Sequence, residues 1–160
     1  AMAEIEPSFN HVKKNQLPHI THEGVMMRLV VGEAYGLSSP VKTYSPMFYI
    51  DVVASKGSVI KRPHPEQETA IFTICGEVTV NGETFGTNEF ILLEPGDSEI
   101  TLASDGRFIM LGGDKFEKVP FLYWNFVSFS KERIEQAKDD WENGRFPTIP
   151  GDDKEFIPLK

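Results

Sequence analysis

The residues best suited to chemistry in this chain are one histidine and three glutamates near its middle. His64, Glu66 and Glu68 alternate along the sequence, so a strand would place all three side chains on one face. Together with Glu99 they would supply one nitrogen and several oxygens to a divalent metal. The competing interpretation is a polar loop whose charges lie in water. We favour the loop and keep the metal site as the alternative.

The other histidines and the single cysteine are weaker candidates. His19 and His22 lie close together and His11 lies further back, so a two-histidine site would lack a third ligand. We expect solvated residues of an N-terminal arm here. Cys75 ends an apolar run, which predicts a packed core thiol rather than a nucleophile, because no base is evident. We find no Ser-His-Asp order, phosphate loop or Cys-x-x-Cys motif.

Composition restricts the class of protein and its partners. A chain of 160 residues with 40% hydrophobic and 25% charged residues fits one globular domain. The net charge of −8 disfavours direct contact with nucleic acid. One cysteine, no signal-peptide pattern and no membrane-length apolar run predict a cytoplasmic protein. Ala1 ahead of Met2 is interpreted as a remnant of an expression tag.

Short apolar segments separated by Gly, Pro and Asn turns predict an all-β fold, either a closed barrel or a jelly roll. Asn81-Gly82 predicts a two-residue hairpin turn, because both residues accept positive φ. Residues 47–53 are apolar nearly throughout, so we expect both faces of that strand to be covered. The expected strands are 26–31, 47–53, 70–75, 77–80, 89–93, 100–103 and 108–111.

Only one segment has the pattern of a helix. Ser130 can cap its start and Gly144 can end it, while Ile134, Ala137 and Trp141 share one face. We therefore expect an arm over 1–24, a barrel over 25–129, a helix over 130–144 and an extended tail over 145–160. Trp141 is expected to bury its indole against the barrel, and the tail to pack on it.

Several motifs together resemble the C-terminal barrel of the pirin family, within the cupin superfamily. The similarity extends over about residues 20–160. The motifs are Ser39-Pro40-Val41-Lys42-Thr43, Met47-Phe48-Tyr49-Ile50-Asp51, Leu111-Gly112-Gly113, Trp124-Asn125-Phe126-Val127-Ser128, Glu132-Arg133-Ile134, Ala137-Lys138, Asp140-Trp141, Gly144-Arg145-Phe146-Pro147, Pro150-Gly151-Asp152 and Glu155-Phe156-Ile157-Pro158-Leu159.

The resemblance implies a cupin barrel without its own metal. In such proteins the N-terminal barrel holds a metal, commonly iron, through three histidines and a glutamate. Some members oxidise quercetin there, and others regulate partner proteins. The C-terminal barrel usually has no metal, so the family's catalytic residues have no positions in this chain.

The general cupin motif leads to the same expectation. With Gly57 and Gly76 as its bounding glycines, Pro63 and Pro65 take the histidine positions, and Thr69 takes that of the glutamate. The later histidine position falls on Glu99. Proline has no side-chain ligand atom, so the usual four-ligand site is absent.

Three functions remain open at this point. The leading hypothesis is a non-catalytic module without a cofactor that binds a second copy, another pirin-like chain or a regulatory protein. Its candidate contact residues are Phe121, Leu122, Trp124 and Phe126. The second is a quercetinase-like dioxygenase that uses iron or another divalent metal at the His64 set. The third is a barrel that binds a small molecule.

Overall fold

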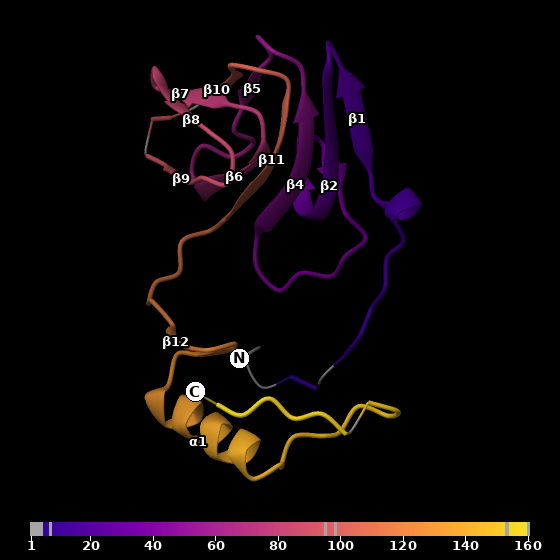
Figure 1. The fold of residues 1–160 in the computed structure, drawn as a ribbon, viewed down its shortest axis with the longest axis vertical. Helices are drawn as coiled ribbons and strands as arrows, with labels where there is room; N and C mark the ends of the chain where they lie inside the picture. Colours follow the sequence, from indigo (N-terminus) through magenta and orange to yellow (C-terminus); the bar gives the residue numbers. More distant parts are fainter. Residues whose placement is uncertain (1–4, 7, 95, 98, 153, 160) are drawn as a thin grey trace. The chain divides into compact units, whose positions relative to one another are not determined.

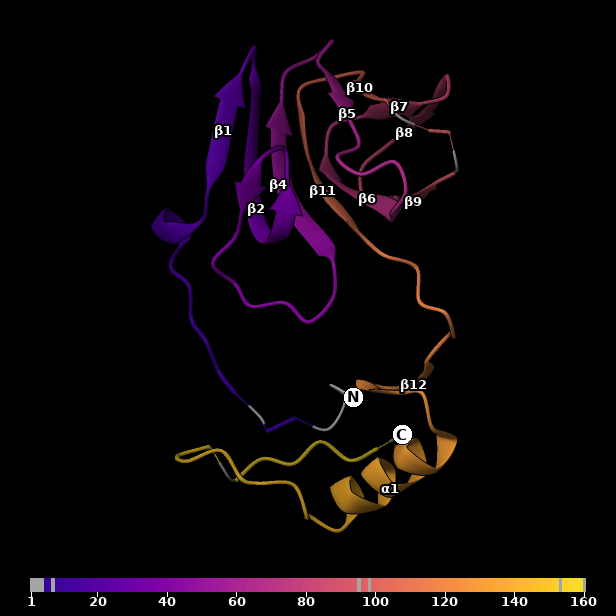
Figure 2. The same cartoon turned by 180° about the vertical axis from the view of Figure 1, so that it is seen from behind.

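The computed structural model describes residues 5–6, 8–94, 96–97, 99–152 and 154–159. They form two compact units, one ending at Lys115 and the other beginning at Phe116. Figures 1 and 2 show the strands of the first unit and the helix of the second. No helix in these residue ranges is long and apolar enough to cross a membrane.

The first unit is a sandwich of two antiparallel sheets, and it confirms the predicted all-β fold. A short 3-10 helix, η1 (Lys14–Gln16), precedes β1. The seven-stranded sheet contains, in spatial order, β1 (His19–His22), β2 (Val25–Ala34), β4 (Met47–Ala54), β11 (Gly106–Gly113), β6 (Glu68–Cys75) and β9 (Phe90–Leu93), with β3 (Leu37–Ser38) also paired to β2. The four-stranded sheet contains β5 (Val59–Lys61), β10 (Glu99–Leu102), β7 (Val78–Val80) and β8 (Glu83–Phe85).

The core lies between the two sheets and is almost entirely apolar. Alternate side chains of β4 and β11, such as Phe48, Ile50 and Phe108, are no more than 1% exposed. Ile60 and Ile100 from the smaller sheet meet them from the other side. Burial of an aromatic or branched side chain contributes about 1.5–3 kcal/mol each, so this layer supplies most of the driving force for folding.

One tight turn and one close approach between strands follow from backbone chemistry. Asn81 and Gly82 have φ of 51° and 81° between β7 and β8, which confirms the predicted hairpin turn. Gly32 lies beside a register irregularity in the pairing of β2 with β4. Its φ is +79°, and a Cβ there would lie 1.7 Å from the carbonyl oxygen of Met47. Only glycine fits that position.

Two expectations about burial are wrong. Met47, Tyr49 and Val53 on the outer face of β4 remain 39%, 36% and 40% exposed, so one face of this strand is covered and the other is not. Cys75 is exposed rather than packed in the core. Cys75 is the last residue of β6 and pairs with Arg107. A register shift before this pair interrupts the regular alternation of core-facing and outward-facing side chains.

The second unit consists of a hairpin, a helix and a tail. The hairpin strands are β12 (Phe121–Tyr123) and β13 (Phe126–Ser128), and the helix α1 (Lys131–Glu142) packs on them. Ser130 caps the helix as predicted, because its hydroxyl accepts a hydrogen bond of 3.2 Å from the Arg133 amide. Residues 116–129, which we had placed in the barrel range, group with the helix and tail. Docking of the helix and tail on the barrel stays a prediction.

Trp141 joins an aromatic cluster inside the second unit. Its ring centroid lies 5.1 Å from that of Trp124, 5.8 Å from Phe146 and 5.5 Å from Phe156. Its Nε1–H donates to the Ile157 carbonyl at 2.8 Å. One side chain therefore connects the hairpin, the helix and the tail.

The first test concerns the glycine at the irregularity of β2. Gly32→Ala should destabilise the barrel strongly, because it adds a backbone collision to the strain of positive φ. Gly36→Ala is the matched control, since Gly36 has φ of +75° with nothing within 4 Å of an added Cβ. It should lose only about 1–2 kcal/mol. Chemical denaturation measures both; equal losses would refute the close approach.

The second test concerns Trp141. Both tryptophans of the chain lie in the second unit, so fluorescence reports on that unit. Trp141→Ala should lower its unfolding free energy by roughly 3 kcal/mol, followed through Trp124. Leu122→Ala, at a side chain that is 72% exposed, should change little. An unchanged midpoint for Trp141→Ala would show that the cluster does not hold the unit together.

Candidate functional site

The structure does not gather the candidate metal ligands. Residues 62–67 form a turn between β5 and β6, so the idea that His64, Glu66 and Glu68 share a strand face is wrong. His64 Nε2–H donates to the Glu33 carbonyl at 3.0 Å, and its Nδ1 lies 3.8 Å from Glu66. A lysine faces each of the other two carboxylates: Lys115 lies 3.9 Å from Glu68, and Lys61 3.4 Å from Glu99.

A buried arginine organises the same turn. The guanidinium of Arg62 donates to the carbonyls of Glu94 and Asp97 at 3.4 and 3.2 Å, to that of Pro65 at 3.0 Å, and to that of Gln67. It therefore ties the 62–67 turn to the turn that follows β9. This fixed cation directly precedes the two prolines at the motif's histidine positions. Its charge disfavours a second cation there.

The motif's glutamate position is also unsuited to metal binding. Thr69 is 1% exposed, and its hydroxyl donates to the Gln67 carbonyl at 3.3 Å.

The Tyr35 hydroxyl donates to the Lys61 carbonyl and lies 4.0 Å from the Met110 sulfur. Burial raises the pKa of Tyr35 well above its ordinary value, so it stays neutral. Within the described part of the chain, no three His, Cys, Asp or Glu side chains form a group that could hold a metal.

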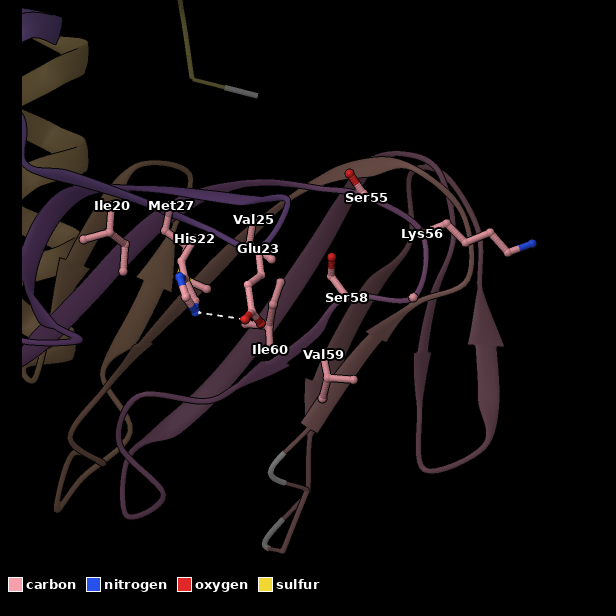
Figure 3. Close-up of a pocket in the computed structure, with 11 residues that line it drawn as sticks. Ile20, His22, Glu23, Val25, Met27, Ser55, Lys56, Ser58, Val59 and Ile60 are labelled. Atoms are coloured by element: carbon pink, nitrogen blue, oxygen red, sulfur yellow. Dashed lines mark ion pairs between the residues drawn. The ribbon is translucent and has the colours of Figure 1, made fainter.

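A cleft of about 570 Å³ opens between the β1–β2 hairpin and the segment leading into β5 (Figure 3). Its lining is mixed: Ile20, Val25, Met27 and Ile60 are apolar, and polar residues such as His22 and Glu23 complete it. His22, which we had expected to be a solvated arm residue, lies in β1 and is exposed, 3.5 Å from Glu23. His19 is also an exposed residue of β1. The Lys56 side chain extends away from the other labelled residues.

The four sequence-predicted contact residues lie on the β12–β13 hairpin of the second unit. Phe121 and Leu122 are exposed. Trp124 packs edge-on against Phe126, with centroids 5.6 Å apart, and both belong to the aromatic cluster around Trp141. The hairpin therefore uses two of the four for its own packing. A role for any of them in binding a partner stays a prediction.

The outer face of the seven-stranded sheet carries apolar side chains that are aligned across five neighbouring strands. We call it the outer face, meaning the outward positions of β2, β4, β11, β6 and β9. Ladder pairing aligns these side chains in rows across the strands. One row is Val31, Tyr49, Leu111, Ala70 and Leu92, and the next is Arg28, Asp51, Ile109, Phe72 and Phe90. Phe90 and Leu92 are each 63% exposed.

One charged group interrupts the outer face. Asp51 accepts hydrogen bonds from Arg107 Nε at 2.7 Å and Nη2 at 3.1 Å, and Arg28 approaches it to 3.5 Å. The hydrogen bond to this carboxylate raises the pKa of Arg107. Two guanidiniums and one carboxylate leave one excess positive charge. Asp51 itself is buried, while the Arg107 side chain remains about half exposed.

Sequence reasoning did not identify the outer face, although a signal was present. Residues 47–53 and 90–93 are apolar at successive positions, whereas a strand with one solvated face alternates apolar and polar residues. We had read the first of these segments as a strand covered on both sides. The structure shows instead which of its two faces lies open.

Comparison with known proteins places this geometry in a family. The sequence matches the pirin C-terminal cupin domain over residues 49–147. It is 38% identical to the pirin-like protein of Caulobacter vibrioides across 98% of this chain and 54% of that protein, and 27% identical to human pirin across 88% and 51%. A solved structure of quercetin 2,3-dioxygenase from Acinetobacter baumannii superposes with a TM-score of 0.78 at 27% identity, covering 90% of this chain and 50% of that one.

The chain thus spans about half the length of these relatives. The match over residues 49–147 extends from β4 of the barrel through α1 of the second unit. The chain belongs to the pirin family, in the part of it that corresponds to the C-terminal cupin domain.

Proposed function

We propose that this chain is a non-catalytic docking module that pairs with a second copy of itself through the outer face. The single observation that carries the proposal is the alignment of two mainly apolar rows on the outward positions of the sheet, where Tyr49, Phe90 and Leu92 are exposed. Burying apolar surface yields about 25 cal/mol per Å². Five neighbouring strands contribute apolar side chains to this face, and a large exposed apolar patch is unusual on a stable monomer.

Symmetry and charge favour a second copy as the partner. The relatives are about twice as long, and the family resemblance implies that each contains two barrels. Pairing of one barrel with another is therefore an arrangement that the resemblance implies for the family. Two-fold pairing also lets one patch satisfy both copies. An obligate interface of this kind should bury well above roughly 1,000 Å² in total.

The site geometry supports a role without catalysis in this barrel. Arg62 and its four carbonyl acceptors occupy the turn that contains the two motif prolines, and Thr69 directs its hydroxyl to the backbone. The alternative is a metal-dependent dioxygenase, suggested by the relative whose structure is titled quercetin 2,3-dioxygenase. In this chain that chemistry would fall to His64 with Glu66, the pair that the structure does bring near each other.

Metal content separates these two functions. After purification without chelator, iron, zinc, copper, nickel and manganese should each be well below one atom per chain by elemental analysis. His64→Ala should leave the content unchanged, since His64 is expected to bind the Glu33 carbonyl rather than a metal. A tightly held metal near one per chain that His64→Ala removes would overturn the non-catalytic role.

Self-association is measured by sedimentation across a dilution series. The wild type should be a dimer at tens of micromolar. Phe90→Ser with Leu92→Ser should raise the dissociation constant at least tenfold, because it truncates two interface side chains that the monomer already exposes. Val59→Ser is the matched control: Val59 is 52% exposed on the other sheet and should change nothing.

Two results would contradict the dimer. One is a sharp monomer mass at tens of micromolar that does not shift when residues 2–13 are deleted, since the deletion removes an arm that could cover the face. The other is an equal loss of dimer in Val59→Ser and in the double variant. A monomer that forms a complex only with a separate pirin-like or regulatory protein would reassign the outer face to that partner.

A further inference from the structure

The outer face carries opposite charges at its two ends. Glu68 lies at one end, in the row of Met47 and Gly113, and Arg107 lies at the other end beside Cys75. Arg107 and Gly113 bound the face along β11, six residues apart. At ~3.4 Å per residue the two rows are separated by about 20 Å. Between them lie the two mainly apolar rows.

Both charges are available to a partner. The Arg107 side chain is 48% exposed even though it binds Asp51, and its group with Arg28 keeps one excess positive charge. Glu68 faces Lys115 at 3.9 Å with both side chains largely exposed, a kind of pair that contributes little. In a dry interface an uncompensated charge is unfavourable, so a partner that covers Arg107 should place a carboxylate near it.

Symmetry limits how two such faces can meet. A two-fold axis between face-to-face sheets must lie in the plane of the interface. If the axis runs along the strands, each row meets itself, and Arg107 faces the Arg107 row of the other copy. If it runs across the strands between the two apolar rows, the Glu68 row meets the Arg107 row. Like charges opposite each other are destabilising, so only the second arrangement matches opposite charges.

We propose that two copies pair with antiparallel strands, so that Glu68 of each copy lies against the Arg107 and Cys75 end of the other. This inference rests on the proposed self-association and adds the orientation of the second copy. It has a direct geometric consequence. Each β6 lies over the other β6, with Glu68 opposite Cys75 of the second copy, while each Cys75 is about 20 Å from its own symmetry mate.

The native cysteine makes this orientation measurable. Cys75 is the chain's single cysteine, and it is exposed on the outer face. Glu68→Cys adds a second thiol at the other end. Facing sheets pack about 10 Å apart, so the short thiol crosslinker bis-maleimidoethane should join position 68 of one copy to Cys75 of the other. Peptide mass mapping identifies the joined positions. Wild type should give little crosslinked dimer.

Two control variants define the background. Glu68→Cys with Cys75→Ser should lose the crosslinked dimer, because positions 68 of the two copies lie far apart. Val59→Cys with native Cys75 places an exposed thiol on the other sheet and should give no dimer-specific crosslink. In addition, Glu68→Gln should weaken the dimer about threefold to tenfold at low salt and less at high salt. Glu66→Gln, a neighbouring exposed carboxylate in the turn, should not.

Each outcome decides the proposal. A 68-to-75 crosslink between copies supports it. A crosslink joining 75 to 75 in wild type, or 68 to 68 in the double variant, would establish the axis along the strands and overturn it. So would the absence of any crosslink in a Glu68→Cys sample that sediments as a dimer. If both Glu68→Cys and wild type sediment as monomers, the proposed self-association fails, and the orientation fails with it.

Discussion

The position of β11 between β4 and β6 is the constraint on which the barrel depends. Successive side chains of a strand point to opposite faces, so this pairing sends Phe108 and Met110 into the core and Ile109 and Leu111 to the outer face. Gly112 helps to fix the register, because a Cβ there would lie 2.5 Å from the Phe48 ring. A slip of one residue would exchange the core set for the outer set. The same ladder therefore specifies both the core and the candidate interface.

A buried arginine, bound to main-chain carbonyls, organises the turn that contains the motif's two proline positions. Arg62 ties the 62–67 turn to the turn after β9 through main-chain carbonyls. The buried guanidinium is tolerated because these acceptors replace the lost water at Nη1 and Nη2, although its Nε is buried without a hydrogen-bond partner among the described residues. Building a metal site at this position would require removing the Arg62 guanidinium as well as replacing Pro63, Pro65 and Thr69.

Local signals in the sequence predicted the parts of the fold that local chemistry decides. The Asn81-Gly82 turn and the Ser130 cap each depend on a few adjacent residues, and both are found in the structure. The exposure of Cys75 depends instead on a register shift between β6 and β11, which has no sequence signature. The outer face was missed for a related reason. An apolar run predicts a strand with little polar character on either face, but it does not say which face the core of the chain covers.

The proposed pairing would couple folding to association, because core positions and candidate interface positions alternate on the same strands. Within β4, Phe48 and Ile50 fill the core while Tyr49 lies in an outer row, so the register that places the core residues also places the outer row. A partner that binds only the folded barrel stabilises it by mass action. Because an apolar sheet face exposed on a partly unfolded chain is also prone to aggregate, pairing with a specific partner protects as well as stabilises. The buried Asp51 with its two arginines gives such a face a specificity that apolar contact alone lacks, since a wrong partner or a shifted register leaves their excess charge unmatched.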